Sequence, residues 1–432
     1  MSAERLLAGA RKHMRLPLLM LIALFTIGLS FSLVSMIDRQ SRALSDYEIE
    51  LGRIEKDISE MKKDASAAPV DVSKASRFVY RLYQRAILSG HPDDLRAAES
   101  GIDRAIREIG PLVDLYVLKA NLDFRMHRVE KAERDIAALT RFGGDARIVG
   151  LKAGIAFQSG RYEEARKGYL LAIENSPTWD NFARLAYWES KFGEINLADK
   201  LYAQAENVVS AKEMRSYAWV KLERGLLELS RGRYQEAAAH YDQADRAYTG
   251  YWLAEDRRAE LLAAERKFDE AIALYRKVIA RAPRPELQQA LGDLFMFMGK
   301  PEEAKPWHDA ALAGYLDSVA RDEIHYYHHL AGFFADARQE GVEALKWARK
   351  DIELRQNFLT QDALAWALYR DGQFGAALGT MERALASGVK DPHVFFHAAM
   401  IHLAAGRSGD GKRFLQMLSH INPGYENFHV HR

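Results

Sequence analysis

A small residue recurs along the chain at intervals close to 34 residues. Seven of the nine intervals are 33 or 34 residues long, and the other two are 39 and 40. This period predicts an array of stacked units, because each unit buries its apolar face only against its neighbours. The two long intervals predict about six extra residues near 206–217 and near 312–324, as longer helices or loops. The ten positions are Ala98, Ala132, Ala165, Ala198, Ala237, Ala271, Ala304, Ala344, Ala377 and Gly411.

One unit shows what each period contains. The segment Ser159–Pro177, SGRYEEARKGYLLAIENSP, resembles the second half of a tetratricopeptide repeat. Its matching residues are Gly160, Tyr162, Ala165, Tyr169, Ala172 and Pro177. The same frame returns in later units, and the resemblance covers residues 79–425. It implies an all-α fold, a right-handed superhelical solenoid of about ten helix pairs at 77–425.

The N-terminal part carries a different signal. Residues 16–37, LPLLMLIALFTIGLSFSLVSMI, contain no charge. A helix of that length rises about 33 Å, enough to cross a bilayer core of about 30 Å. The segment therefore predicts one transmembrane helix, with a cleaved signal peptide as the alternative.

The charges around this segment predict its orientation. Four basic residues precede it, whereas the basic residues that follow it are mixed with acidic ones. The positive-inside rule then places the tail 1–15 in the cytoplasm and the solenoid outside the inner membrane, in a periplasm. The reversed topology, with a cytoplasmic solenoid, is the alternative.

A short stalk is expected directly after the span. In residues 38–63, apolar residues repeat every seven positions in two rows offset by three, as in a coiled coil. The pattern fits homo-oligomerisation through the stalk, and equally a helix that packs on its own domain. Residues 64–76, with Pro69, form a linker to the solenoid, and residues 426–432 form a C-terminal tail.

The resemblance also implies a binding surface. The first helix of each pair lines a concave groove, and aromatic side chains there suit an extended peptide or a partner helix. Burial in the core of the superhelix is the alternative for each residue. Trp366 and Tyr369 are the strongest candidates. The predicted groove residues are Tyr187, Phe297, Tyr326, His329, Phe333, Trp366, Tyr369 and Arg370.

Composition excludes several kinds of chemistry. The chain has no cysteine, so disulfides, thiolate metal sites and a cysteine nucleophile are ruled out. A net charge of +1 gives no overall attraction for nucleic acid. The phosphate-binding, dinucleotide and hydrolase motifs are missing from the sequence. We therefore expect a protein that is not an enzyme and needs no cofactor.

Histidine is concentrated after residue 300, where ten of the fourteen lie. Asp322, His325 and His329 fall on one helical face, and His393 and His397 form a second pair four residues apart. We assign no metal site, since a third ligand is not identifiable from sequence, but Asp322, His325 and His329 are the candidates.

The sequence thus predicts a membrane-anchored scaffold or adaptor. It would bind envelope protein partners through its groove, in assembly, secretion or export. The alternative is a metal-binding accessory protein that uses the C-terminal histidines.

Overall fold

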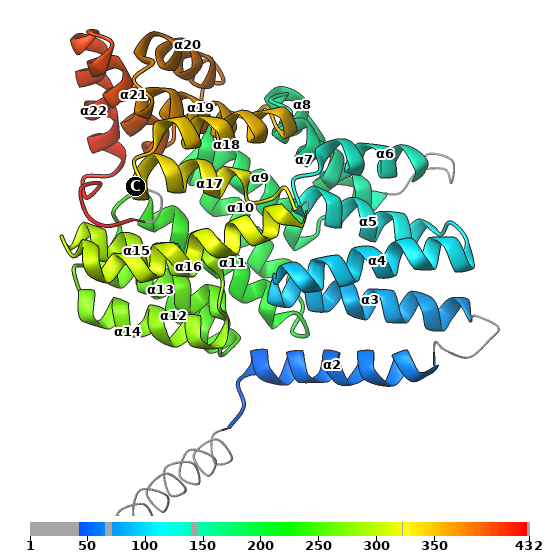
Figure 1. Ribbon diagram of the computed structural model, residues 1–432. Coiled ribbons are helices and arrows are strands. Elements are labelled where there is room, and N and C mark those ends of the chain that lie inside the picture. Colours follow the sequence, from blue (N-terminus) through cyan, green and yellow to red (C-terminus); the bar gives the residue numbers. More distant parts are fainter. Residues whose placement is uncertain (1–42, 65–70, 140–145, 322, 430–432) are drawn as a thin grey trace, which may run out of the picture. The chain divides into compact units, whose positions relative to one another are not determined.

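The computed structural model describes residues 43–64, 71–139, 146–321 and 323–429 (Figure 1). Within these ranges all regular structure is helical, which confirms the predicted all-α solenoid. After the first described helix, α2 (Asp46–Asp64), each helix packs back on the one before it to form a pair. The pairs are α3 (Val72–Ser89) with α4 (Pro92–Ile109), α5 (Val113–Arg125) with α6 (Val129–Leu139), α7 (Val149–Gln158) with α8 (Tyr162–Asn175), α9 (Trp179–Lys191) with α10 (Ile195–Val208), α11 (Met214–Leu229) with α12 (Tyr234–Ala247), α13 (Trp252–Ala264) with α14 (Phe268–Arg281), α15 (Pro285–Phe297) with α16 (Pro301–Ala320), α17 (Tyr327–Gly332) with α18 (Gly341–Leu354), α19 (Phe358–Arg370) with α20 (Phe374–Leu385), and α21 (Pro392–Ala404) with α22 (Ser408–Ile421). A short 3-10 segment, η2 (Ala146–Ile148), precedes α7, and a π-helical turn, η3 (Phe333–Ala337), follows α17.

The periodic small residues lie where the two helices of a pair come closest. All nine alanines are at most 1% exposed, and each stands in the first turn or two of the second helix. The tenth position, Gly411, is also buried, and a Cβ atom there would lie 2.6 Å from the side chain of Leu403. The period in the sequence is therefore a packing requirement, because a larger side chain would push the two helices apart.

The two long intervals are filled mainly by longer helices. Helix α16 has 20 residues, whereas α8, α12 and α14 have 14. Helix α11 has 16 residues, whereas α9, α13 and α15 have 13. The added residues therefore extend the array without breaking its pairing.

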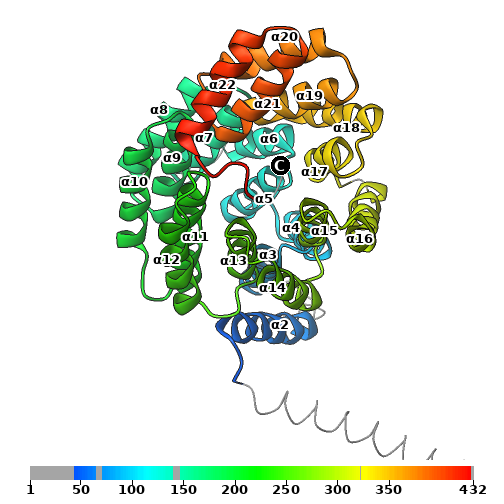
Figure 2. The same ribbon diagram turned by 90° about the vertical axis from the view of Figure 1, so that its left-hand side faces the viewer.

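Successive turns of the superhelix touch one another. The Gln356 amide donates to the Gln158 carbonyl at 2.8 Å, and the Lys390 amide donates to the Lys191 carbonyl at 2.8 Å. Many of the side-chain bonds between the turns join residues 190 to 203 apart in sequence. With a period near 34, this separation corresponds to about six pairs per superhelical turn. Figure 2 shows the pairs following one another around this curve.

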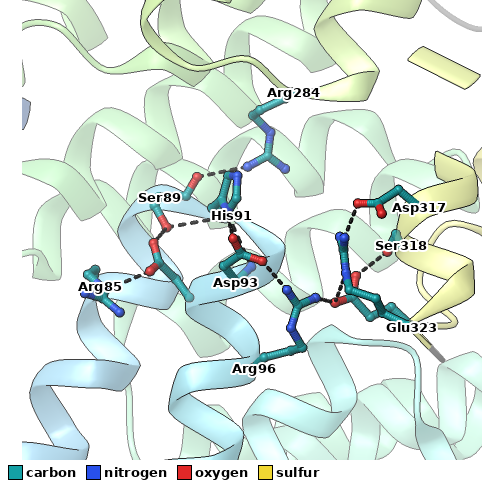
Figure 3. Close-up of polar contacts among 11 residues, drawn as sticks. Arg85, Ser89, His91, Asp93, Arg96, Arg284, Asp317, Ser318 and Glu323 are labelled. Atoms are coloured by element: carbon teal, nitrogen blue, oxygen red, sulfur yellow. Dashed lines mark hydrogen bonds and ion pairs between the residues drawn. The ribbon is translucent and has the colours of Figure 1, made fainter. Parts of the chain in front are cut away.

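An ionic seam connects the first pair to the end of α16 (Figure 3). Glu323 is only 1% exposed, and it pairs with Arg96 of α4 and with Arg321. Beside it, Arg284 donates to the Ser89 carbonyl at 2.9 Å. A buried carboxylate is tolerated only when opposite charges compensate it, as Arg96 and Arg321 do here. Arg96 and Arg284 are the groups that join the two turns.

Glycines in the turns allow this close approach. Gly90, Gly160, Gly193 and Gly232 all have a positive φ and also lie against the next superhelical turn. A Cβ atom on Gly160 would lie 2.7 Å from the Gln356 carbonyl oxygen. The equivalent glycines of later pairs, which include Gly372, have nothing within 4 Å of such an atom. The same turn residue thus has an additional role where a second turn packs against it.

The segment predicted as a coiled-coil stalk, residues 38–63, contains nearly all of helix α2, which packs on its own domain. Tyr47, Ile54 and Ile58 of its heptad rows are at most 8% exposed, because they pack into a core shared with α3, α12 and α13. The N-terminal end of α2 is fixed at the loop between α12 and α13, where the Tyr47 amide donates to the Thr249 carbonyl at 3.1 Å. Packing on its own domain, the alternative interpretation of the heptads, is confirmed. Tyr47, Ile54 and Ile58 are therefore not available for homo-oligomerisation.

The predicted linker at 64–76 is shorter than expected. Residues 65–70 lie outside the described part, and α3 already begins at Val72. The Asp71 carboxylate accepts a hydrogen bond from the Lys74 amide at 2.9 Å and so caps the helix.

The predicted localisation also needs correction. The tail 1–15 and the predicted span 16–37 lie outside the described residues. In the described ranges, no helix is both long enough and apolar enough to cross a membrane. On this finding, a single-pass inner-membrane protein with an extracytoplasmic solenoid is not supported.

Alanine substitutions at Gly160 and Gly372 separate the two roles of a turn glycine. Both residues have a φ of +76°, so both substitutions carry the same left-handed strain of about 1 kcal/mol. Gly160→Ala must also displace the Gln356 carbonyl, and we expect it to cost about 1 to 3 kcal/mol more. Urea denaturation followed by circular dichroism measures the difference. Equal losses from the two substitutions would contradict a tight contact between turns.

Candidate functional site

A cavity of about 540 Å³ opens among the last four helix pairs. It is lined by α15, α17 with η3, α19 and α21, which are the first helices of those pairs. Residues Phe428 and His429 of the C-terminal segment line it as well. The cavity therefore lies on the surface where the resemblance placed the groove, and the chain's own end forms part of its wall.

The structure places the predicted groove residues in three different settings. Phe297, His329, Trp366, Tyr369 and Arg370 line the cavity. Tyr326 and Phe333 do not belong to its wall, since they are 2% and 0% exposed and pack in the core. Tyr187 lies elsewhere, edge-on to Phe157 with Lys191 over its ring.

An aromatic stack forms one wall of the cavity. The Trp366 ring lies parallel to His397 at a centroid distance of 4.0 Å and parallel to Tyr369 at 4.7 Å. The Trp366 indole N–H donates to an Asp336 carboxylate oxygen at 2.9 Å. Trp366 is only 7% exposed, so it presents little of its surface, whereas Tyr369 is half-buried. Stacking and hydrogen bonding together fix the orientation of the wall.

Two histidines and a carboxylate meet between α19 and α21. The His397 Nδ1 atom lies 3.0 and 3.1 Å from the two Asp362 carboxylate oxygens. The His393 Nε2 atom lies 4.0 Å from the same carboxylate, and its Nδ1 atom lies 3.5 Å from the Tyr425 hydroxyl. The four-residue spacing of the histidines was visible in the sequence, but Asp362 precedes them by about one repeat and was not connected to them.

The histidines predicted as metal candidates have another environment. His329 stacks on Tyr315, and His325 packs against Tyr326. Burial lowers the pKa of both histidines to about 4. Asp322 lies outside the described residues. In the described part of the chain, the ligand atoms that come together belong to Asp362, His393 and His397 instead.

The C-terminal segment folds across the end of the cavity. Phe428 is 3% exposed and packs edge-on against Phe297 at 5.7 Å. The segment also reaches the first superhelical turn, where the Tyr234 hydroxyl donates to the Gly424 carbonyl at 3.3 Å and Arg266 donates to Asn427 at 3.2 Å. It thus links the last repeats to α12 and to the turn before α14.

A family model for the tetratricopeptide repeat matches residues 117–178, 193–251 and 363–410. The three matched segments carry tetratricopeptide repeats. The third matched segment contains the α21 residues of the cavity and the α19 residues from Ala363 onward, so this part of the cavity is built on tetratricopeptide helices. Arrays of this kind typically act as binding scaffolds rather than as enzymes.

One solved structure is similar in fold, at low sequence identity. A solved structure titled "Crystal structure of APC/C hetero-tetramer Cut9-Hcn1" is similar over 80% of this chain and 74% of that chain, with 17% identity and a TM-score of 0.41. No curated protein matches the sequence.

Carboxylates set the charge of the tetratricopeptide cavity. Asp293, Asp336 and Asp362 line it, together with the guanidinium group of Arg370. Burial raises the pKa of Asp336 to about 6, although the charge of His397 and the hydrogen bond from Trp366 lower it. Arg370 donates to the Ala335 carbonyl at 2.6 Å, which occupies part of its hydrogen-bonding capacity. The cavity therefore carries excess negative charge at neutral pH.

Replacing Asp336 by Asn tests this electrostatic assignment. The pKa of Asp336 is higher in the folded chain than the ordinary value of 3.8, so its protonated form is favoured by folding. That stabilisation is full below about pH 4 and is lost as the pH rises through about 6. We expect Asp336→Asn to raise the stability by about 1 to 3 kcal/mol at pH 8, and by much less at pH 4. Thermal unfolding at both pH values measures it, and an equal effect at both would refute the assignment.

Proposed function

We propose that the protein is a scaffold that binds a segment of a protein partner in the cavity of its last four repeats. Tetratricopeptide proteins bind protein partners on the first helices of their repeats, and the cavity lies on those helices. The observation that carries the proposal is the combination of aromatic and acidic side chains on one concave wall.

The chemistry of the wall favours a segment with lysine or arginine beside an apolar residue. Three carboxylates face one guanidinium group in the cavity. The exposed side chain of Met296 and the half-buried ring of Phe396 provide apolar contact. A cation beside these aromatic rings would gain from both charge and cation–π attraction.

A role in envelope assembly, secretion or export is not part of this proposal. That role depended on the membrane localisation that the described helices do not support. The proposal concerns the binding surface alone, which does not depend on the compartment.

Site-specific photo-crosslinking in cells tests the proposal. Met296 lines the cavity and is 39% exposed, whereas Met417 lies on α22 outside the cavity and is 37% exposed. A photoreactive residue at Met296 should crosslink to a partner that the same residue at Met417 does not reach. A synthetic peptide with the crosslinked sequence should then bind the purified chain.

Two further substitutions measure the contribution of the wall. We expect Tyr369→Ala and Asp293→Asn each to weaken binding of that peptide by about tenfold or more. Trp366 is unsuitable for this purpose, because truncating so buried a side chain costs about 3 to 5 kcal/mol of stability. Equal crosslinking from Met296 and Met417, or unchanged peptide affinity in both variants, would contradict the proposed site.

A further inference from the structure

Asp362, His393 and His397 form a compact group on the wall of the cavity. One ligand atom from each residue lies within 4.8 Å of the others. From this geometry we propose that the three side chains bind a divalent transition-metal ion, with zinc as the reference ion. The inference stands apart from the proposed function, because it concerns the chain's own side chains and needs no protein partner.

The fold brings the ligands together from two neighbouring repeats. Asp362 lies on α19, and the two histidines lie four residues apart on α21, so their side chains leave the helix on the same face. The first helices of adjacent pairs pack side by side, which places that face opposite Asp362. Both elements are long, regular helices, and such elements hold ligand positions better than loops do.

The distances between the three ligand atoms are compatible with binding of one metal ion. Ligand atoms on one tetrahedral zinc ion lie about 3.3 Å apart, because the Zn–N and Zn–O bonds are about 2.0 to 2.2 Å long. The Asp362 and His397 atoms already lie 3.0 Å apart. The His393 Nε2 atom must move closer to the Asp362 carboxylate, from which it now lies 4.0 Å away. The His393 side chain is 31% exposed and so has space to move. Binding therefore requires a side-chain adjustment and no movement of the helices.

The two ring nitrogens of His397 have different surroundings. The Nε2 atom of His397 is buried, on a residue that is 3% exposed, and it has no hydrogen-bond partner in the described part of the chain. An unsatisfied buried nitrogen is costly in free energy. His397 lines the cavity, and its other ring nitrogen is oriented by Asp362. On metal binding, the hydrogen bond between Asp362 and Nδ1 would be replaced by a bond from each group to the ion, and the ring proton would reside on Nε2.

The donor set selects the class of ion. Two imidazoles and one carboxylate suit zinc, nickel, cobalt or copper better than calcium or magnesium, which prefer oxygen ligands. Three protein ligands leave at least one position open toward the cavity, as in zinc sites that exchange their fourth ligand. The other three cavity groups with charge, Asp293, Asp336 and Arg370, leave a net negative surface that attracts a cation.

Isothermal titration of the full chain with ZnCl₂, after removal of metal with chelator, tests the proposal. We expect one equivalent to bind with a dissociation constant of about 1 µM or lower. His393→Ala should weaken that binding by at least about 100-fold. His420→Ala, which removes an exposed histidine at the end of α22, should leave it unchanged. Asp362→Asn keeps the shape of the side chain and provides a second test if His393→Ala does not fold.

Titration with CoCl₂ adds a spectroscopic readout. Cobalt bound by imidazole and carboxylate should give a visible absorption band that is lost in His393→Ala and Asp362→Asn. No binding at stoichiometric zinc, or equal binding by His393→Ala and His420→Ala, would overturn the proposal and leave Asp362 and His397 as a structural hydrogen bond only. Peptide binding measured in the presence of chelator is a separate assay, so failure of the metal site and failure of the proposed function remain distinguishable.

Discussion

The contact between one superhelical turn and the next is the constraint on which the rest of the structure depends. At Gly160 and Gly193 the backbone of the first turn lies directly against the loops that lead into α19 and α21. Backbone hydrogen bonds between the turns form only because these residues have no side chain in the way. The contact holds the last two repeats in place from outside. The cavity on α19 and α21 is therefore supported by residues almost 200 positions earlier in the chain.

The close packing of the turns explains why some of the residues predicted to line the groove are buried instead. A position rule for the first helix of each pair treats every repeat alike, as in an open superhelix. Here α17 has only six residues and continues into the π-helical turn η3. Tyr326 and Phe333 lie at the two ends of α17 and pack against Tyr315 of the long helix α16, so both are buried. Of the predicted groove residues, His329 of α17 stays on the cavity wall, together with Phe297 of α15 and Trp366, Tyr369 and Arg370 of α19.

The cavity combines features that rarely occur together on a packed surface. Trp366 stacks between an aromatic ring and an imidazole, and its indole is fixed by a carboxylate. Buried polar groups of this kind rigidify a site when they are satisfied and mark a ligand when they are not. A metal ion on His397 would neutralise Asp362 and lower the negative charge of the wall. Metal and a cationic segment would then oppose one another electrostatically in the same cavity.

The sequence by itself determined the repeat, since small residues at a fixed period are needed wherever two helices meet. Buried alanines such as Ala165 and Ala237 lie at those contacts. The sequence also predicted Trp366, Tyr369 and Arg370 as groove residues, and these three line the cavity. Only the tertiary structure decided that α2 packs on its own domain, because a heptad pattern describes an apolar face and not the surface that covers it. Likewise, only the structure joined Asp362 to His393 and His397 and laid the C-terminal segment over the cavity. Those contacts depend on the packing of neighbouring repeats and on how tightly the array winds, and a local pattern in the sequence records neither.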